Sequence, residues 1–257
     1  MQSLNHELEI EFNNIDKFIL EKYKVNIRKK EQLINYVKTS LIFLQSLKVW
    51  DNNLEKKYNM VSGIDNYFKE MISNMIHAII LGTIDLKVPA LVMLRRTQEI
   101  ILTYLYYSEH PVEYYKKENN DSIRNINGFN ELKEYIKQYP FFIKYNVDEK
   151  QLKELVLKII DDWTKQYKDL SNYVHGTNSD YFQMISYMDE FKFIKKDVNY
   201  LTKQVNMTST IVNMLLMVFY FDTYVAMDDV SQKSIIRRAI SNERTYKKDI
   251  VEIFREI

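Results

Sequence analysis

The stretch YKDLSNYVHG, which ends at Gly176, contains the residues of this chain best suited to acid–base chemistry. His175 stands directly before the glycine, with Ser171 and Asn172 one turn earlier and Lys168 one turn before those. On a helix these polar side chains share one face and can meet one ligand. The negative end of a helix dipole favours a cationic side chain, which would suit a proton donor or a phosphate contact. The same pattern is also typical of a plain helix C-cap, in which glycine adopts the left-handed conformation.

A second group of polar residues lies in the stretch LVMLRRTQE. Arg95 and Arg96 are both within helical reach of Glu99. An arginine among apolar residues needs a partner, so an internal arginine–glutamate ion pair is one explanation. The other is an anion site, in which the guanidinium matches a phosphate and the carboxylate behind it holds it in place.

Several kinds of chemistry have no sequence support. The chain has no cysteine, no HExxH motif and no glycine-rich phosphate loop, so we expect neither a metal site nor a cofactor. His77 lies in a nearly apolar segment and is expected in the core, whereas His6 and His110 are expected at the surface. With 36 basic and 35 acidic residues, the chain also lacks the basic excess of a dedicated nucleic-acid coat.

The elements that must position these residues are helices. Only 4 glycines and 3 prolines occur in 257 residues, so tight turns are few and the helices are long. Apolar residues spaced by three and four predict an all-α single domain over 1–257, with a core at 64–227, N-terminal helices at 1–60 and a C-terminal helix at 229–257. About eight helices are expected, at 3–23, 30–50, 64–82, 88–108, 129–138, 149–175, 195–227 and 230–255, with a long central loop at 110–128.

The longest apolar run, MLLMVFYF, covers Met214 to Phe221. It is much shorter than the roughly 20 residues that span a bilayer, so it predicts a buried central helix. The N-terminal stretch is acidic and shows no apolar run typical of a signal peptide. Together with the absence of cysteine, these features favour a cytoplasmic protein without a membrane partner.

The two motifs together resemble the HEPN superfamily. LRRTQE on one helix and YKDLSNYVHG at the end of a later one are similar to an uncharacterised branch with the motif Tyr-x-x-Leu-Ser-x-Tyr-Val-His-Gly, over about residues 64–227. The resemblance implies a compact helical bundle that forms a homodimer. It also implies a metal-independent endoribonuclease, or a degenerate relative, acting on RNA or through a protein partner in anti-phage defence or a toxin–antitoxin system.

The resemblance implies a role for each motif residue. The usual signature places an arginine four to six residues before the histidine, but Lys168 stands at the longest allowed spacing from His175. The catalytic arginine would then be Arg95 or Arg96, and we expect one of them to approach His175. The residues that would support the catalytic pair or bind the ligand are Glu99, Lys168, Ser171, Asn172 and Tyr173.

A non-catalytic helical module remains the alternative. In it, the same polar cluster would serve structure or a small anionic ligand, and the chain would act through a partner protein. The missing arginine-to-histidine spacing and the net charge of +1 favour this alternative. A shared cleft formed by His175 and an arginine would favour the ribonuclease.

Overall fold

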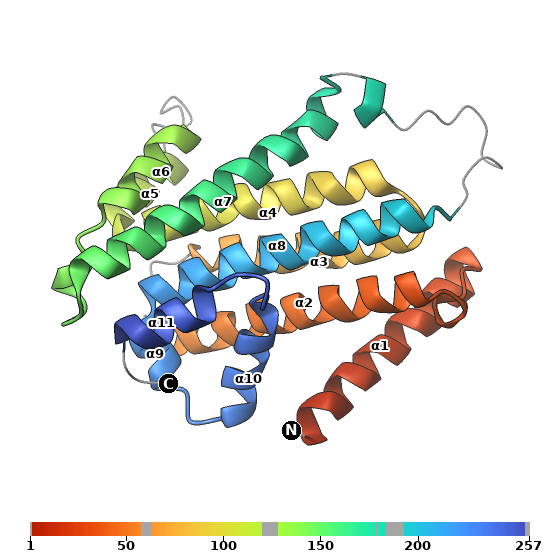
Figure 1. Ribbon diagram of the computed structural model, residues 1–257, viewed down its shortest axis with the longest axis horizontal. Coiled ribbons are helices and arrows are strands. Elements are labelled where there is room, and N and C mark those ends of the chain that lie inside the picture. Colours follow the sequence, from red (N-terminus) through yellow and green to blue (C-terminus); the bar gives the residue numbers. More distant parts are fainter. Residues whose placement is uncertain (1, 58–62, 120–127, 178, 183–192, 255–257) are drawn as a thin grey trace.

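The computed structural model describes residues 2–57, 63–119, 128–177, 179–182 and 193–254, and every regular element in this part of the chain is helical. The prediction of an all-α fold is therefore confirmed for these residues (Figure 1). The α-helices are α1 (Gln2–Tyr23), α2 (Glu31–Lys57), α3 (Asp65–Thr83), α4 (Lys87–Glu109), α5 (Pro111–Asn119), α6 (Phe129–Gln138), α7 (Glu149–His175), α8 (Lys195–Phe219), α9 (Phe221–Val225), α10 (Val230–Ala239) and α11 (Tyr246–Phe254).

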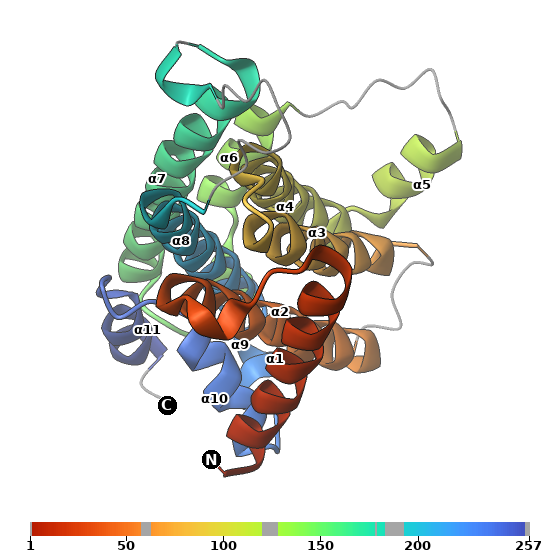
Figure 2. The same ribbon diagram turned by 90° about the vertical axis from the view of Figure 1, so that its right-hand side faces the viewer.

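The long helices pack side by side around α8. This helix contacts α2, α4, α7 and α10, while α3 and α4 form a closely packed pair joined by a short turn (Figure 1). Seen along the bundle, α6 lies against α4 and α7, and α5 lies at the edge of the molecule (Figure 2). The helices that bear the two sequence motifs, α4 and α7, are thus direct neighbours.

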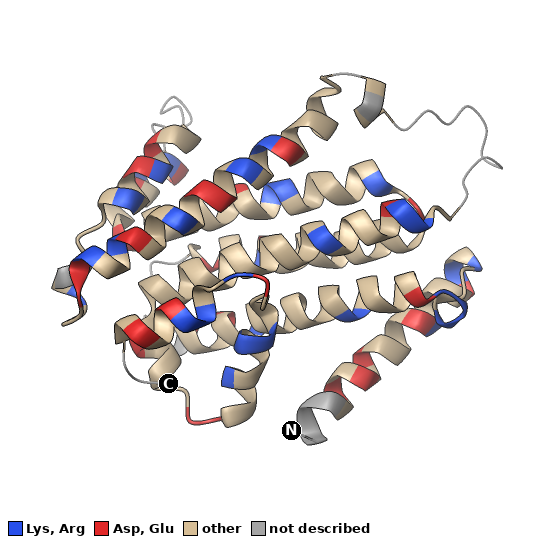
Figure 3. Ribbon diagram, viewed as in Figure 1, with Lys and Arg blue, Asp and Glu red and all other residues tan. Residues whose placement is uncertain are grey.

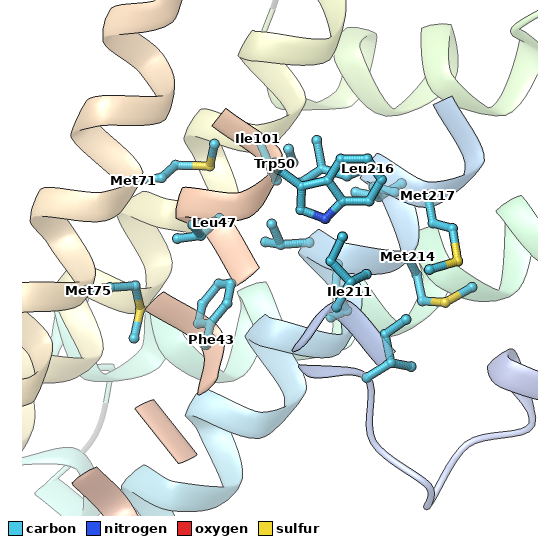
Figure 4. Packing of buried hydrophobic residues seen from close by; sticks show 14 of the residues in the cluster. Phe43, Leu47, Trp50, Met71, Met75, Ile101, Ile211, Met214, Leu216 and Met217 are labelled. Carbon is cyan, nitrogen blue, oxygen red and sulfur yellow. The ribbon is translucent and has the colours of Figure 1, made fainter. Parts of the chain in front are cut away.

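The central position of α8 follows from its sequence. Every residue from Thr208 to Phe221 is buried, which confirms the buried helix predicted from the apolar run. Polar residues in this stretch find internal partners: Asn213 accepts from the indole nitrogen of Trp50 at 3.1 Å and donates to Ser46 at 3.0 Å. Figure 4 shows Trp50 among leucine, isoleucine and methionine side chains of α2, α4 and α8. This packing fixes α2 and α8 relative to each other.

The helix predicted at 195–227 is interrupted at Tyr220, which has φ −129° and ψ 39°. The hydroxyl of Tyr145 donates to the carbonyl of Phe219 at 2.9 Å and accepts from the backbone N–H of Phe221 at 3.0 Å. A side chain that inserts into the backbone ladder in this way ends or kinks a helix. The prediction of one helix was wrong because the interrupting group comes from a distant part of the chain.

Two other predicted boundaries are corrected. The prediction of a loop at 110–128 was wrong for Pro111–Asn119, which forms α5, and 120–127 lies outside the described residues. The helix predicted at 230–255 is two helices, because Ile240 leaves the helical conformation and the backbone N–H of Ser241 donates to Thr210 of α8 at 2.9 Å. This hydrogen bond turns the chain so that α11 packs on α7.

Candidate functional site

The C-terminal end of α7 positions His175. Asp148 caps the N-terminus of the helix, where its side chain accepts from the backbone N–H of Gln151, and the last residue of the helix is His175. Gly176 follows with φ 54° and ψ 49°, and its N–H donates to the carbonyl of Asn172. A left-handed residue at this position is typical of helix ends, and glycine adopts it at little cost. The prediction of a histidine at a helix C-terminus is confirmed.

Arg95 of α4 reaches His175 from the neighbouring helix. Its Nη1 lies 3.4 Å from Nε2 of His175, at the long end of the hydrogen-bond range. This contact confirms the geometric prediction that one of the two arginines approaches the histidine. Because an arginine N–H only donates, this hydrogen bond forms in the tautomer whose ring proton sits on Nδ1, with Nε2 as the acceptor. The imidazole is exposed to solvent, so a ligand has access to it.

Tyr167 and Glu99 hold the Arg95 side chain in place. Nη2 of Arg95 donates to the Tyr167 hydroxyl at 2.9 Å, and that hydroxyl donates to Oε1 of Glu99 at 3.0 Å. Nε of Arg95 lies 3.1 Å from the same carboxylate oxygen, although its N–H makes no aligned hydrogen bond. Burial raises the pKa of Tyr167, while the hydrogen bond from Arg95 opposes that rise, so the tyrosine stays a neutral bridge.

Two stacked aromatic rings of α7 support the Arg95 side chain. The rings of Trp163 and Tyr167 stack with centroids 4.7 Å apart and planes within 9° of parallel. The guanidinium of Arg95 lies 5.0 Å from the centroid of the Tyr167 ring. Cation–π contacts of this kind are worth about 0.5–2 kcal/mol. Residues one turn apart on α7 thereby fix the position of an arginine on α4.

Arg96 points to a different neighbour. Its Nη2 pairs with Oε1 of Glu70 on α3 at 2.9 Å, and its side chain is 57% exposed. Of the two arginines proposed for catalysis, Arg95 contacts His175, whereas Arg96 forms an ion pair with α3.

The remaining motif residues make mostly local contacts. Ser171 donates to the carbonyl of Tyr167 at 2.7 Å, and Asn172 donates to the hydroxyl of Tyr181 at 3.3 Å. The ring of Tyr173 packs edge-on against that of Tyr181, with centroids 4.9 Å apart. These contacts are local to the C-terminal end of α7. A ligand role for Ser171, Asn172 and Tyr173 stays a prediction. Lys168 is exposed on the same helix.

A buried polar network links the three helices behind the site, and the sequence analysis did not identify it. Gln98 of α4 donates to Gln166 of α7 at 2.5 Å, and Gln166 donates to Oε1 of Gln204 on α8 at 2.8 Å. Gln204 in turn donates to Asp169 at 3.0 Å, and Tyr200 donates to the same carboxylate at 2.5 Å. The signal in the sequence is the placement of Gln166 next to the apolar stripe of α7. The network sets the register between α4, α7 and α8 that brings Arg95 to His175.

The other histidines lie outside this site. His77 is exposed on α3, so the prediction of a core position was wrong. Met75, Ala78 and Ile79 are buried, whereas Ile76 and His77 fall on the outer side of the helix. His110 is half-buried, with its ring stacked on Tyr106 at 4.3 Å and Nδ1 2.9 Å from the carbonyl of that residue.

An open groove of about 540 Å³ runs along α4, and its lining includes Arg95 but not His175. Its wall on α4 includes Arg96, Glu99 and Tyr107, and Lys117 of α5 lies at one end. The other lining residues come from α3, α4 and α6 or directly precede α6: Tyr67, Val92, Ile100, Thr103, Gly128, Phe129 and Leu132. Figure 3 shows charges of both signs alternating along α7, in keeping with the net charge of +1.

The described residues contain neither a candidate metal site nor a candidate membrane span. No three acidic or histidine side chains there gather in a way that could hold a metal ion. No helix in the same part of the chain has the length and apolarity needed to cross a membrane. Comparison of the chain with models of known families, with curated proteins and with solved structures gave no match. The geometry of the site is therefore the basis on which a function can be proposed.

Proposed function

We propose that this chain is a HEPN-like protein that cleaves RNA without a metal ion, acting in anti-phage defence or a toxin–antitoxin system. The observation that supports the proposal is the 3.4 Å approach of Arg95 to His175, which joins an arginine and an exposed histidine from residues 80 positions apart. A cation next to a proton-transfer group is the pairing that phosphate chemistry needs. In this proposal Arg95 of α4 takes the place of the arginine that the usual signature has four to six residues before the histidine.

In this proposal the substrate supplies its own nucleophile. The 2′-hydroxyl of RNA gives its proton to Nε2 of His175 and forms a bond to the adjacent phosphorus, while the bond to the 5′-oxygen breaks. That oxygen takes a proton from solvent, so the products are a 2′,3′-cyclic phosphate and a 5′-hydroxyl end. The contact from Arg95 to His175 is long and therefore easily broken. The Nη1–H of Arg95 then donates to the phosphate oxygen as negative charge gathers there.

Tyr167 and Glu99 have a positioning role in this proposal. Tyr167 accepts a hydrogen bond from Nη2 and Glu99 forms an ion pair with the guanidinium on its Nε side, so that Nη1 is the group left to meet the substrate. A pre-oriented arginine needs little reorganisation in the transition state. A second copy of the chain in a homodimer would bring two such helix ends to one substrate.

A non-catalytic binding module is the second candidate. The observation that favours it is the pairing of Arg95 with Glu99, since an arginine already balanced by a carboxylate can be purely structural. In that case the chain would bind an anion or a partner protein at the same face and leave RNA intact.

An RNA-cleavage assay in EDTA separates the two candidates. We expect cleavage by the wild type in the chelator, with a 2′,3′-cyclic phosphate end. His175→Ala and Arg95→Ala should each lower the rate by about a hundredfold or more. His77→Ala is the matched control, because that histidine is also exposed but lies on α3. Circular dichroism should show that all variants stay folded.

Two results would contradict the proposed metal-independent mechanism at His175. One is full cleavage by the folded His175→Ala variant, which would return His175 to the role of a helix end. The other is loss of wild-type cleavage in EDTA, which would point to metal-dependent chemistry. No cleavage by any form of the protein would support the binding module.

A further inference from the structure

A pocket of about 370 Å³ lies between α7, α8 and the turn that joins α10 to α11. Figure 1 shows this turn beside α8, where the N–H of Ser241 donates to Thr210 at 2.9 Å. The volume is near the lower end of the range of about 300–1,000 Å³ that is typical of small-molecule sites. The pocket is thus large enough for a small metabolite, and neither Arg95 nor His175 lines it.

The inner wall of the pocket consists of polar side chains that are held in place by hydrogen bonds. Gln166 and Gln204 both line it and are 5% and 6% exposed, and Nε2 of Gln166 donates to Oε1 of Gln204 at 2.8 Å. Asp169 accepts from Gln204 at 3.0 Å and from Tyr200 at 2.5 Å, in both cases through Oδ2. Its other oxygen, Oδ1, accepts from no group in the described part of the chain, so it is available to a ligand.

Three charged side chains at the opening of the pocket are free of ion pairs. Lys165, Lys203 and Glu243 are exposed, and no ion pair joins any of them to another described residue. Arg244 differs, since its Nε lies 3.1 Å from Oδ2 of Asp162 and its Nη2 donates to Oδ1 of the same carboxylate at 3.2 Å. A ligand that contacts the three free side chains therefore breaks no ion pair of the protein.

The charges around the pocket cancel. Arg244 and Asp162 neutralise each other, which leaves the two lysines against the carboxylates of Asp169 and Glu243. A simple anion would be attracted by the lysines and repelled by the carboxylates, and a simple cation would meet the reverse. A ligand that carries both charges can place each next to its opposite. The balance therefore favours a zwitterion over an ion of either sign.

We propose that this pocket binds a small zwitterion of the size of an amino acid. Its carboxylate contacts Lys203, and its ammonium contacts Glu243 and Oδ1 of Asp169. Hydrogen bonds between ionised groups are about twice as strong as neutral ones. Because Gln166 also accepts from Gln98 of α4, the bound ligand lies against the network that aligns α4 with α7. Such a site is independent of RNA cleavage.

Calorimetric titration of the protein with the common L-amino acids, one at a time, tests the site. We expect at least one of them to bind. Its N-acetyl derivative lacks the ammonium and its amide lacks the carboxylate. Each derivative should bind about tenfold more weakly than the parent or worse, which is the usual loss for one hydrogen bond between charged groups.

Two substitutions at exposed positions identify the partner of each charge. Lys203→Gln should weaken binding of the amino acid about tenfold and leave binding of its amide unchanged, because the amide has no carboxylate for Lys203 to contact. Glu243→Gln should weaken binding of the amino acid and leave binding of the N-acetyl form unchanged. Lys196→Gln is the matched control, since Lys196 is exposed on the same helix and does not line the pocket. Circular dichroism should show that all three variants stay folded.

The absence of binding by every common amino acid would overturn this site. Equally tight binding of inorganic phosphate would also overturn it, because it would indicate a plain anion site. Equal effects of Lys203→Gln and Lys196→Gln would do the same, since Lys203 would then act only through the net charge of the protein.

Discussion

Replacing Gln166 by leucine tests the buried network that aligns α4, α7 and α8. Gln166 is 5% exposed, and Gln98 is fully buried. Leucine has a similar size but no polar atoms, so Nε2 of Gln98 and Oε1 of Gln204 each lose a partner. A buried polar group without a partner costs about 1–3 kcal/mol. We therefore expect the free energy of unfolding to fall by about 3 kcal/mol, which lowers Tm by roughly 6–12 °C for a chain of this size.

A double-mutant cycle makes this prediction specific to the hydrogen bond. Oε1 of Gln98 is already buried without a partner. The double variant Gln98→Leu/Gln166→Leu removes both glutamines, so neither leaves the other unpaired. Its loss of stability should be smaller than the sum of the single losses by about 1–3 kcal/mol.

Urea unfolding followed by circular dichroism measures all three variants. Gln151→Leu is the control, since it is the same substitution at an exposed site of α7 and should change the stability by less than about 0.5 kcal/mol. If the two core substitutions add within about 0.5 kcal/mol, the network does not couple α4 to α7 and the reasoning is refuted.

Three further predictions concern single residues. Gly176→Ala should destabilise the protein by about 1 kcal/mol in urea unfolding, since φ is +54° there and an added Cβ would lie 2.9 Å from the Phe182 ring. Arg96→Ala should change the unfolding free energy by no more than about 0.5 kcal/mol, because its ion pair is exposed; a larger loss would show that the pair is structural. Asp85→Asn should raise Tm at neutral pH, because burial, and then the charge of Asp197, raise the pKa of Asp85. Folding thus favours the protonated acid, so the wild type loses stability relative to the variant as pH rises above about 4, and an equal gap in Tm at pH 3 and pH 7 would contradict this.

The sequence was sufficient for the elements with strong periodicity. The expected bounds of 149–175 match α7, because its apolar stripe is continuous and the His175–Gly176 step marks its end. The helix breaks that the sequence did not predict depend on contacts between distant residues. No glycine or proline marks Tyr220, where the hydroxyl of Tyr145 interrupts the helix.

The candidate site was predictable only in part. The chemistry of arginine and histidine side chains made Arg95 and His175 candidates, and the apolar periodicity placed each on a helix. The choice between Arg95 and Arg96 could not be made from adjacent positions, because it depends on which neighbouring helix offers Glu70 or Tyr167.

The stack beneath Arg95 gives the protein a built-in optical reporter. The chain has two tryptophans, and Trp163 lies against the Tyr167 ring whose hydroxyl contacts Arg95. The other, Trp50, is bound to Asn213 in the core, far along the chain from either motif. In a Trp50→Phe variant the remaining indole emission would come from a ring two contacts away from the guanidinium. An anion that shifts Arg95 could then be followed by fluorescence, without a label on protein or ligand.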